Sequence, residues 1–189
     1  AGKGSIIQLA DLDADINMFS VASSRSVIRD LYLDGRCDLN TAGVQIGVSS
    51  TTTDLSIENN YFTRFRTYGF YTSNSAYSQN IIRGNTFTGN VTALRVSGTS
   101  DSITGNTFTN NSSEAVQLFG TSTTFSGNTL SGNSIGVNVS GANIVTSNTI
   151  RSHTSYGVSM QNSGGTVSDN LITGNTGGGI AVQGTNGLI

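Results

Sequence analysis

The chain has 189 residues, of which 35% are hydrophobic and 11% are charged, and its formal net charge is −2. This balance excludes the basic footprint of a nucleic-acid-binding protein, and no apolar run reaches the ~18 residues that a membrane-spanning helix needs. Gly, Ser, Thr and Asn replace the missing charge, while recurring Ile, Val, Thr and Phe indicate ordered β structure rather than disorder.

The chain is predicted to have two regions of unequal length. Residues 1–26 are expected to form an N-terminal cap or first strand region, and residues 27–189 are expected to form a series of β-helix coils. Such coils bury their apolar faces on their neighbours, and an uncovered apolar end strand would pair with other chains. We therefore expect a fragment of a longer helix or a homo-oligomer such as a trimer.

A repeat of about 22 residues organises the coil region. Its clearest copies are GNTFTGN from Gly84, GNTFTNN from Gly105 and GNTLSGN from Gly127. The aligned Asn residues, separated by 25, 21, 22, 20 and 22 positions, are Asn60, Asn85, Asn106, Asn128, Asn148 and Asn170. An earlier copy carries Leu31 in the Asn place, which gives about seven coils in all.

Each coil contains three short segments in which inward apolar residues alternate with outward ones, as in a strand with one buried face. The segment before the Asn gives the inward column Ile28, Ile57, Ile82, Ile103, Phe125, Val145 and Val167. The segment after it gives Leu33, Phe62, Phe87, Phe108, Leu130, Ile150 and Ile172. The third segment starts at a small residue, namely Gly43, Gly69, Ala93, Ala115, Gly136, Gly157 or Gly179.

No segment shows the apolar periodicity of a helix. The prediction is therefore an all-β protein, a right-handed, single-stranded parallel β-helix with three strands in each coil. In the first coil this alignment places Val44 and Ile46 inside and Gln45 outside.

The Asn column has a structural explanation. A sharp bend between strands leaves backbone N–H and C=O groups without partners. An Asn side chain carries two donors and an acceptor, so stacked Asn side chains can bond these groups and one another at the ~4.8 Å spacing of β-strands. The column is therefore predicted to be a buried ladder rather than a row of sugar-binding amides.

The pattern I-x-x-N-x-F followed by G-I-x-V resembles the pectate-lyase-like superfamily of right-handed β-helices, over residues 28–182. The superfamily includes phage tailspike and tail-fibre proteins and secreted carbohydrate-active enzymes. The resemblance implies a polysaccharide partner and a location that is extracellular, on the cell surface or on a virion. Other members are only stalks, so the alternative is a structural spacer without catalytic activity.

One phrase is similar to the catalytic sequence Tyr-Gly-Phe-Asp-Pro-His of mannuronan C5-epimerases. The chain has Tyr68, Gly69 and Phe70 in the first three places, but Tyr71 stands for Asp and Ser73 for His. Both proton-transfer groups are missing, so the epimerase motif is not intact. If the chain is an enzyme, a polysaccharide lyase or a glycoside hydrolase remains, and the sequence assigns no catalytic residue.

Candidate carbohydrate-binding residues lie on the outward side of the third segment and in the loop before it. They are Gln45, Arg66, Tyr68, Tyr71 and Arg95. Aromatic rings can pack against sugar rings, and a guanidinium group can bind a carboxylate through two parallel hydrogen bonds. The alternative is a solvated face on which Arg95 simply covers Tyr71.

The sequence predicts no metal site and no cofactor. It contains one cysteine, Cys37, and one histidine, His153, whereas structural zinc takes four such ligands. His153 occupies a loop position equivalent to Asn90, Asn111, Asn133 and Asn175. It is therefore expected to be a bend residue rather than a catalytic base.

Overall fold

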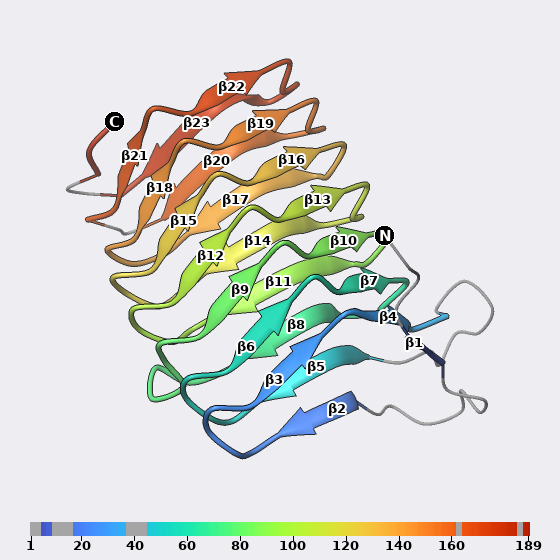
Figure 1. The fold of residues 1–189 in the computed structure, drawn as a ribbon. Coiled ribbons are helices and arrows are strands. Elements are labelled where there is room, and N and C mark those ends of the chain that lie inside the picture. The colour runs from blue at the N-terminus through green and yellow to red at the C-terminus, as the bar shows by residue number, and fades with distance from the viewer. Residues whose placement is uncertain (1–4, 9–16, 37–44, 162–163, 185–186) are drawn as a thin grey trace.

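The computed structural model describes residues 5–8, 17–36, 45–161, 164–184 and 187–189. In these ranges the chain forms 23 strands, all of them paired in parallel, in three sheets that we name A, B and C. Figure 1 shows the coils stacked on one another, from β2 and β3 at the bottom to β22 at the top. The predicted all-β parallel helix of about seven coils is confirmed.

Each sheet forms one wall of the helix, and successive strands of a wall are one coil apart. Sheet A contains β1 (Ser5–Gln8), β4 (Leu31–Asp34), β7 (Tyr61–Thr63), β10 (Thr86–Thr88), β13 (Thr107–Thr109), β16 (Thr129–Ser131), β19 (Thr149–Arg151) and β22 (Leu171–Thr173). Sheet B contains β2 (Asn17–Val21), β5 (Ile46–Ser50), β8 (Tyr68–Thr72), β11 (Thr92–Val96), β14 (Glu114–Leu118), β17 (Ile135–Val139), β20 (Tyr156–Gln161) and β23 (Gly178–Gln183). Sheet C contains β3 (Val27–Arg29), β6 (Ser56–Glu58), β9 (Ile81–Arg83), β12 (Ser102–Thr104), β15 (Thr124–Ser126), β18 (Ile144–Thr146) and β21 (Thr166–Ser168).

Among the residues that the structure describes, no helix has the length and the apolar character of a membrane span.

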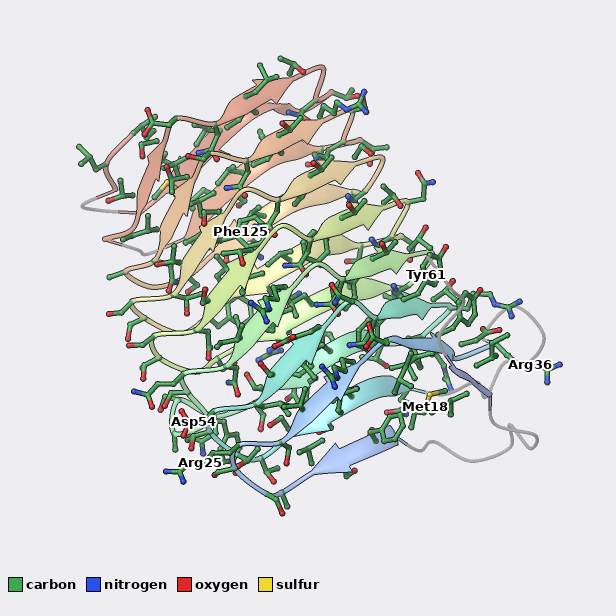
Figure 2. All side chains as sticks on the ribbon, viewed as in Figure 1. Met18, Arg25, Arg36, Asp54, Tyr61 and Phe125 are labelled. Atoms are coloured by element: carbon green, nitrogen blue, oxygen red, sulfur yellow. The ribbon has the colours of Figure 1, made fainter. Side chains whose placement is uncertain are left out.

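Side chains fill the space between the three walls, and Phe125 lies among them (Figure 2). The predicted inward columns of sheets A and C pair residue by residue, as Phe87 does with Phe62 and Phe108. The rings of Phe62 and Phe87 stack with centroids 4.6 Å apart, and those of Phe87 and Phe108 with centroids 5.1 Å apart. These columns form one continuous apolar core.

The predicted alignment of the first coil is wrong in sheet B. Val48, not Val44, pairs with Phe70, and Ser49, not Gln45, pairs with Tyr71. The small residue at the corner is Gly47, where an added Cβ would lie 2.5 Å from the carbonyl oxygen of Gly69. Gly43 and Val44, which the sequence alignment used, lie outside the described residues. The coil therefore starts its third strand four residues later than the repeat predicted.

The predicted Asn ladder runs along the corner between sheets C and A, and we name it the CA ladder. Within it, the backbone N–H of Asn106 donates to Oδ1 of Asn128 at 2.9 Å, and its side-chain amide donates to the same oxygen at 3.0 Å. That amide also donates to the carbonyl of Ile82 at 2.9 Å. The same pattern joins Asn60, Asn85, Asn106, Asn128, Asn148 and Asn170. The bonds to backbone N–H and C=O groups satisfy these groups at the bends, and the amide–amide bonds join neighbouring rungs, as predicted.

Polar ladders also occupy the other two corners. The AB ladder, between sheets A and B, contains Asn90, Asn111, Asn133, His153 and Asn175. The BC ladder, between sheets B and C, contains Asn80, Asp101, Thr123 and Asn143. Each BC residue stands five positions before a CA residue, and each AB residue stands five positions after one. The coil of Asn60 has Leu55 and Phe65 at these two places instead.

Candidate functional site

The outer face of sheet B brings together three of the predicted sugar-binding residues. Tyr68 and Tyr71 project from β8, and Tyr71 pairs with Arg95 of β11 in the neighbouring coil. The two tyrosine rings stack with centroids 4.8 Å apart and an interplanar angle of 20°. Strict strand alternation would point residues three apart to opposite faces, but the alternation is interrupted at the corner, where the consecutive residues Gly69 and Phe70 are both buried.

Arg95 lies among aromatic rings from both neighbouring coils. Its guanidinium carbon is 5.5 Å from the centroid of Tyr71, 6.0 Å from that of Tyr68 and 4.8 Å from that of Phe119. Nη1 donates to the hydroxyl of Tyr68 at 3.3 Å. Within the described residues no acidic side chain forms an ion pair with Arg95. We name Tyr68, Tyr71, Arg95 and Phe119 the aromatic–arginine cluster.

Phe119 is the member that sequence reasoning missed. It directly follows β14, whose last residue Leu118 points into the core. Because successive residues of an extended chain point to opposite sides, Phe119 projects outward beside Arg95. This alternation was readable from the sequence, but the contact with Arg95 depends on how the coil that carries β14 stacks on the coil that carries β11.

Gln45 and Arg66 lie beside the cluster rather than within its ring stack. Gln45 immediately precedes β5, and its backbone carbonyl accepts hydrogen bonds from the N–H groups of Thr67 at 2.9 Å and Tyr68 at 3.1 Å. Arg66 is exposed in the loop that leads to β8. The described contact of Gln45 is therefore structural, made by its main chain.

Glu114 is the carboxylate nearest to the cluster along the same wall. It begins β14, three residues before Gln117, which pairs with Arg95. Burial acts to raise the pKa of Glu114, but hydrogen bonds from Ser113, Gln117 and Asn138 outweigh it and hold that pKa below its ordinary value. The Ser113 hydroxyl donates to Oε2 at 2.5 Å. Glu114 therefore stays ionised near neutral pH and acts as a hydrogen-bond acceptor.

The other described acidic side chains with strong partners lie on different walls. Asp34, at the end of β4 in sheet A, binds Arg64 through two parallel contacts, of which Nε to Oδ1 is 2.8 Å. Glu58 in sheet C binds Nη2 of Arg83 at 3.0 Å. Asp101 lies inside the BC ladder, 1% exposed. The structure thus distributes these carboxylates instead of gathering them at one site.

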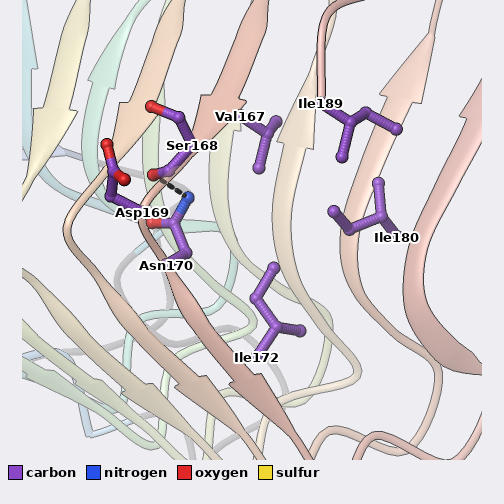
Figure 3. A pocket seen from close by; sticks show the side chains of 7 residues that line it. All are labelled: Val167, Ser168, Asp169, Asn170, Ile172, Ile180 and Ile189. Carbon is purple, nitrogen blue, oxygen red and sulfur yellow. Dashed lines mark hydrogen bonds between the residues drawn. The ribbon is translucent and has the colours of Figure 1, made fainter.

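A hollow of about 310 Å³ lies at the C-terminal end of the stack (Figure 3). Its lining is mostly apolar and consists of Val167, Ser168, Asp169, Asn170, Ile172, Ile180 and Ile189. The amide of Asn170 donates to the carbonyl of Ser168 at 2.8 Å within it. Four strand positions of sheet B separate β11 from β23, a distance of about 19 Å at the usual strand spacing. The hollow is the uncovered end of the core and is separate from the aromatic–arginine cluster.

Comparison with known proteins agrees with this fold. Residues 17–142 match the family model described as periplasmic copper-binding protein (NosD). Residues 102–189 match the model described as right-handed beta helix region, which confirms the predicted handedness. No curated protein sequence matches the chain significantly.

One solved structure is similar in its backbone. It is the crystal structure of PfbA, a surface adhesin of Streptococcus pneumoniae, with a TM-score of 0.57 and 14% sequence identity. The alignment covers 86% of this chain and 45% of the PfbA chain, so the chain spans less than half the length of that adhesin. At this identity the likeness concerns the fold alone.

Proposed function

For this chain, which belongs to the family described as periplasmic copper-binding protein (NosD), we propose the function of an extracytoplasmic β-helix module that binds polysaccharide. The binding surface is the outer face of sheet B around the aromatic–arginine cluster. The word periplasmic in the family description and the surface location of the PfbA adhesin both support a place outside the cytoplasm. The comparisons give no support to a phage tailspike, and the proposal does not include a virion.

The proposal depends on the surroundings of the Arg95 side chain. Its side chain is held against three aromatic rings, yet no described carboxylate neutralises it. By contrast, Arg64 and Arg83 each bind an acidic partner. A fixed guanidinium group beside tyrosine rings offers hydrogen-bond donors and apolar surface together, which suits a sugar chain with hydroxyl or carboxylate groups.

The arrangement of acids favours binding over hydrolysis. Glycoside hydrolases of the usual kind place two carboxyl groups roughly 5 Å or 6.5–9.5 Å apart across the bond that they cleave. In the described strands of sheet B, Glu114 is the one acidic residue. It is ionised and hydrogen-bonded, so it can accept bonds from sugar hydroxyl groups without a partner acid.

A panel of neutral and acidic polysaccharides, screened on a glycan array and then by titration calorimetry, tests the proposal. We expect one class to bind, and we expect Tyr71→Ala and Arg95→Ala each to weaken binding by roughly tenfold. Tyr61→Ala and Arg151→Ala are matched controls, because both side chains lie on the outer face of sheet A. They should leave the affinity unchanged. Binding that survives both sheet B variants would overturn the proposed surface.

A second candidate function is a rigid spacer, and the outer walls of sheets A and C favour it. Many of their outward positions carry small hydroxyl side chains in register from coil to coil, namely Thr86, Thr88, Thr107, Thr109, Ser102, Thr104, Thr124 and Ser126. Such positions make good strand surfaces and bring no charged side chains together, and the ion pair of Glu58 and Arg83 lies on the preceding strands of sheet C. If no polysaccharide binds the folded chain, the spacer function stands and the polysaccharide proposal fails.

A further inference from the structure

The description of the matched family names copper, so the copper ligands in this chain decide whether such a site can form. Copper in proteins takes thiolate and thioether sulfur in its reduced state and imidazole nitrogen in either state, with several ligands converging on one ion. The chain contains one Cys, one His and two Met residues. The matched segment, residues 17–142, holds only Cys37 and Met18 of these four.

His153 is already used as a rung of the AB ladder. Its Nδ1 accepts a hydrogen bond from the backbone N–H of Asn133 at 3.1 Å, and its own backbone N–H donates to Oδ1 of Asn175 at 3.0 Å. An imidazole whose Nδ1 accepts carries its proton on Nε2 in the neutral form. Neither ring nitrogen therefore presents a free lone pair to a metal ion.

The surroundings of Nε2 also leave no room for an ion. His153 is 1% exposed, and Nε2 is buried without a hydrogen-bond partner. A Cβ placed on Gly136 would lie 2.9 Å from this nitrogen, so the backbone of that glycine closes the space in front of the ring. His153 thus takes the place of an Asn amide at this bend and functions as a structural residue.

The two thioethers are far apart and serve other roles. Met160 is 1% exposed and belongs to an inward column, where it pairs with Val139 and Val182. Met18 lies on β2, six strand positions away from β20 in sheet B, which is about 29 Å at the usual spacing. Cys37 lies outside the described residues. Within the described ranges no group of three or more His, Cys, Asp or Glu side chains is placed to hold a metal ion.

From the number and placement of these possible copper ligands we infer that the folded chain binds no copper, although its family is described as copper-binding. The match to the family model then reflects coil-forming residues, such as Asn85 and Phe87 at the CA ladder and in the core, rather than copper ligands. The inference does not depend on the proposed polysaccharide function.

The test is a direct measurement of copper bound to the whole folded chain. The protein is stripped of metal, incubated with one to three equivalents of Cu(II), or of Cu(I) buffered by a chelator, then desalted and measured by mass spectrometry for metal and by absorbance for protein. We expect far less than one copper per chain and no shift of the melting temperature. Cys37→Ser, Met18→Leu and His153→Asn should give the same low ratio as the parent chain.

One copper per folded chain, retained through desalting and accompanied by a higher melting temperature, would overturn the inference. Loss of that copper in Cys37→Ser or Met18→Leu would then locate the site at the N-terminal coils, and loss in His153→Asn would locate it at the AB ladder. A ratio that is low and equal in all four proteins sustains the inference.

Discussion

Asp101 accepts two hydrogen bonds from Asn80 through a single carboxylate oxygen, at 2.8 Å from the backbone N–H and 2.9 Å from the side-chain amide. Its other oxygen, Oδ2, is buried without a partner. Elsewhere in the BC ladder this place holds an amide, as in Asn143, whose Nδ2 donates to the carbonyl of Gly120 at 2.9 Å. Burial raises the pKa of the Asp101 carboxyl to about 6.

Replacing this acid should stabilise the protein at neutral pH. Because the folded-state pKa lies above the unfolded value near 3.8, the folded chain holds a proton that the unfolded chain releases, and stability falls as pH rises from about 4 to about 6. Asp101→Asn carries no charge and should be more stable than the parent by roughly 1–3 kcal/mol at pH 8. Urea unfolding at pH 8 and pH 4 measures this difference, which should shrink at pH 4.

Asp54→Asn is the matched control for that comparison, since Asp54 is an exposed loop residue with a positive φ of 56° that Asn also adopts readily. It should change stability little at either pH. If Asp101→Asn is no more stable than the parent at pH 8, the hydrogen bonds to the Asp101 carboxylate offset the free-energy cost of its burial, and the expected gain is wrong.

His153 should produce a pH dependence of the opposite sign. Burial lowers the pKa of His153 below its ordinary value of 6.5, so the unfolded chain takes up a proton before the folded chain does. The contribution of His153 to stability is therefore lost as pH falls below about 6.5. His153→Asn restores the amide found at neighbouring rungs and should remove this loss. Thermal unfolding of both proteins at pH 7.5 and pH 5 would show it, and an equal acid effect in both would contradict the assignment.

The CA ladder should be sensitive to loss of one amide. Asn106→Leu removes the acceptor for the backbone N–H of Asn85 and the donor to the carbonyl of Ile82, leaving both groups buried without those bonds. We expect a loss of about 1–3 kcal/mol in the free energy of unfolding. Ser112→Ala, at an exposed position of the next bend, is the control and should have little effect. Chemical denaturation compares them, and equal stabilities would count against the ladder.

The aromatic stack of sheet A should be costly to interrupt. Phe108 is fully buried. The centroid of its ring is 5.1 Å from that of the stacked Phe87 ring and 6.0 Å from that of the tilted Phe125 ring. Phe108→Ala should lower the free energy of unfolding by about 3–5 kcal/mol, because neighbouring coils cannot close the cavity. Thr107→Ala changes the outward side of the same strand and should cost far less. A loss below about 1 kcal/mol for Phe108→Ala would mean that the coils repack around the gap.

The alignment of the first coil shows why repeat reading failed locally. Gly43-Val44-Gln45-Ile46 fits the whole G-I-x-V pattern, whereas Gly47-Val48-Ser49-Ser50 has a polar residue in the last place, so the pattern selected the first. Backbone pairing with β8 selects the second, in which Ser50 lies opposite Thr72. The BC ladder escaped detection for a related reason, since Asp101 and Thr123 interrupt the run of Asn residues, although their spacing repeats that of the CA ladder.

The sequence by itself determined the coil, its period, the inward columns of sheets A and C and the CA ladder. These features recur from coil to coil, apart from Leu31 in the Asn place of the first copy, because each coil must bury the same face on its neighbour. Only the tertiary structure decided where the first coil enters sheet B and that Arg95 lies between Tyr71 and Phe119. It also decided that the His153 ring accepts a hydrogen bond as a rung of the AB ladder. Such contacts join residues of different coils. Which side chains meet depends on small differences in the length of each coil, and an average repeat length does not contain these differences.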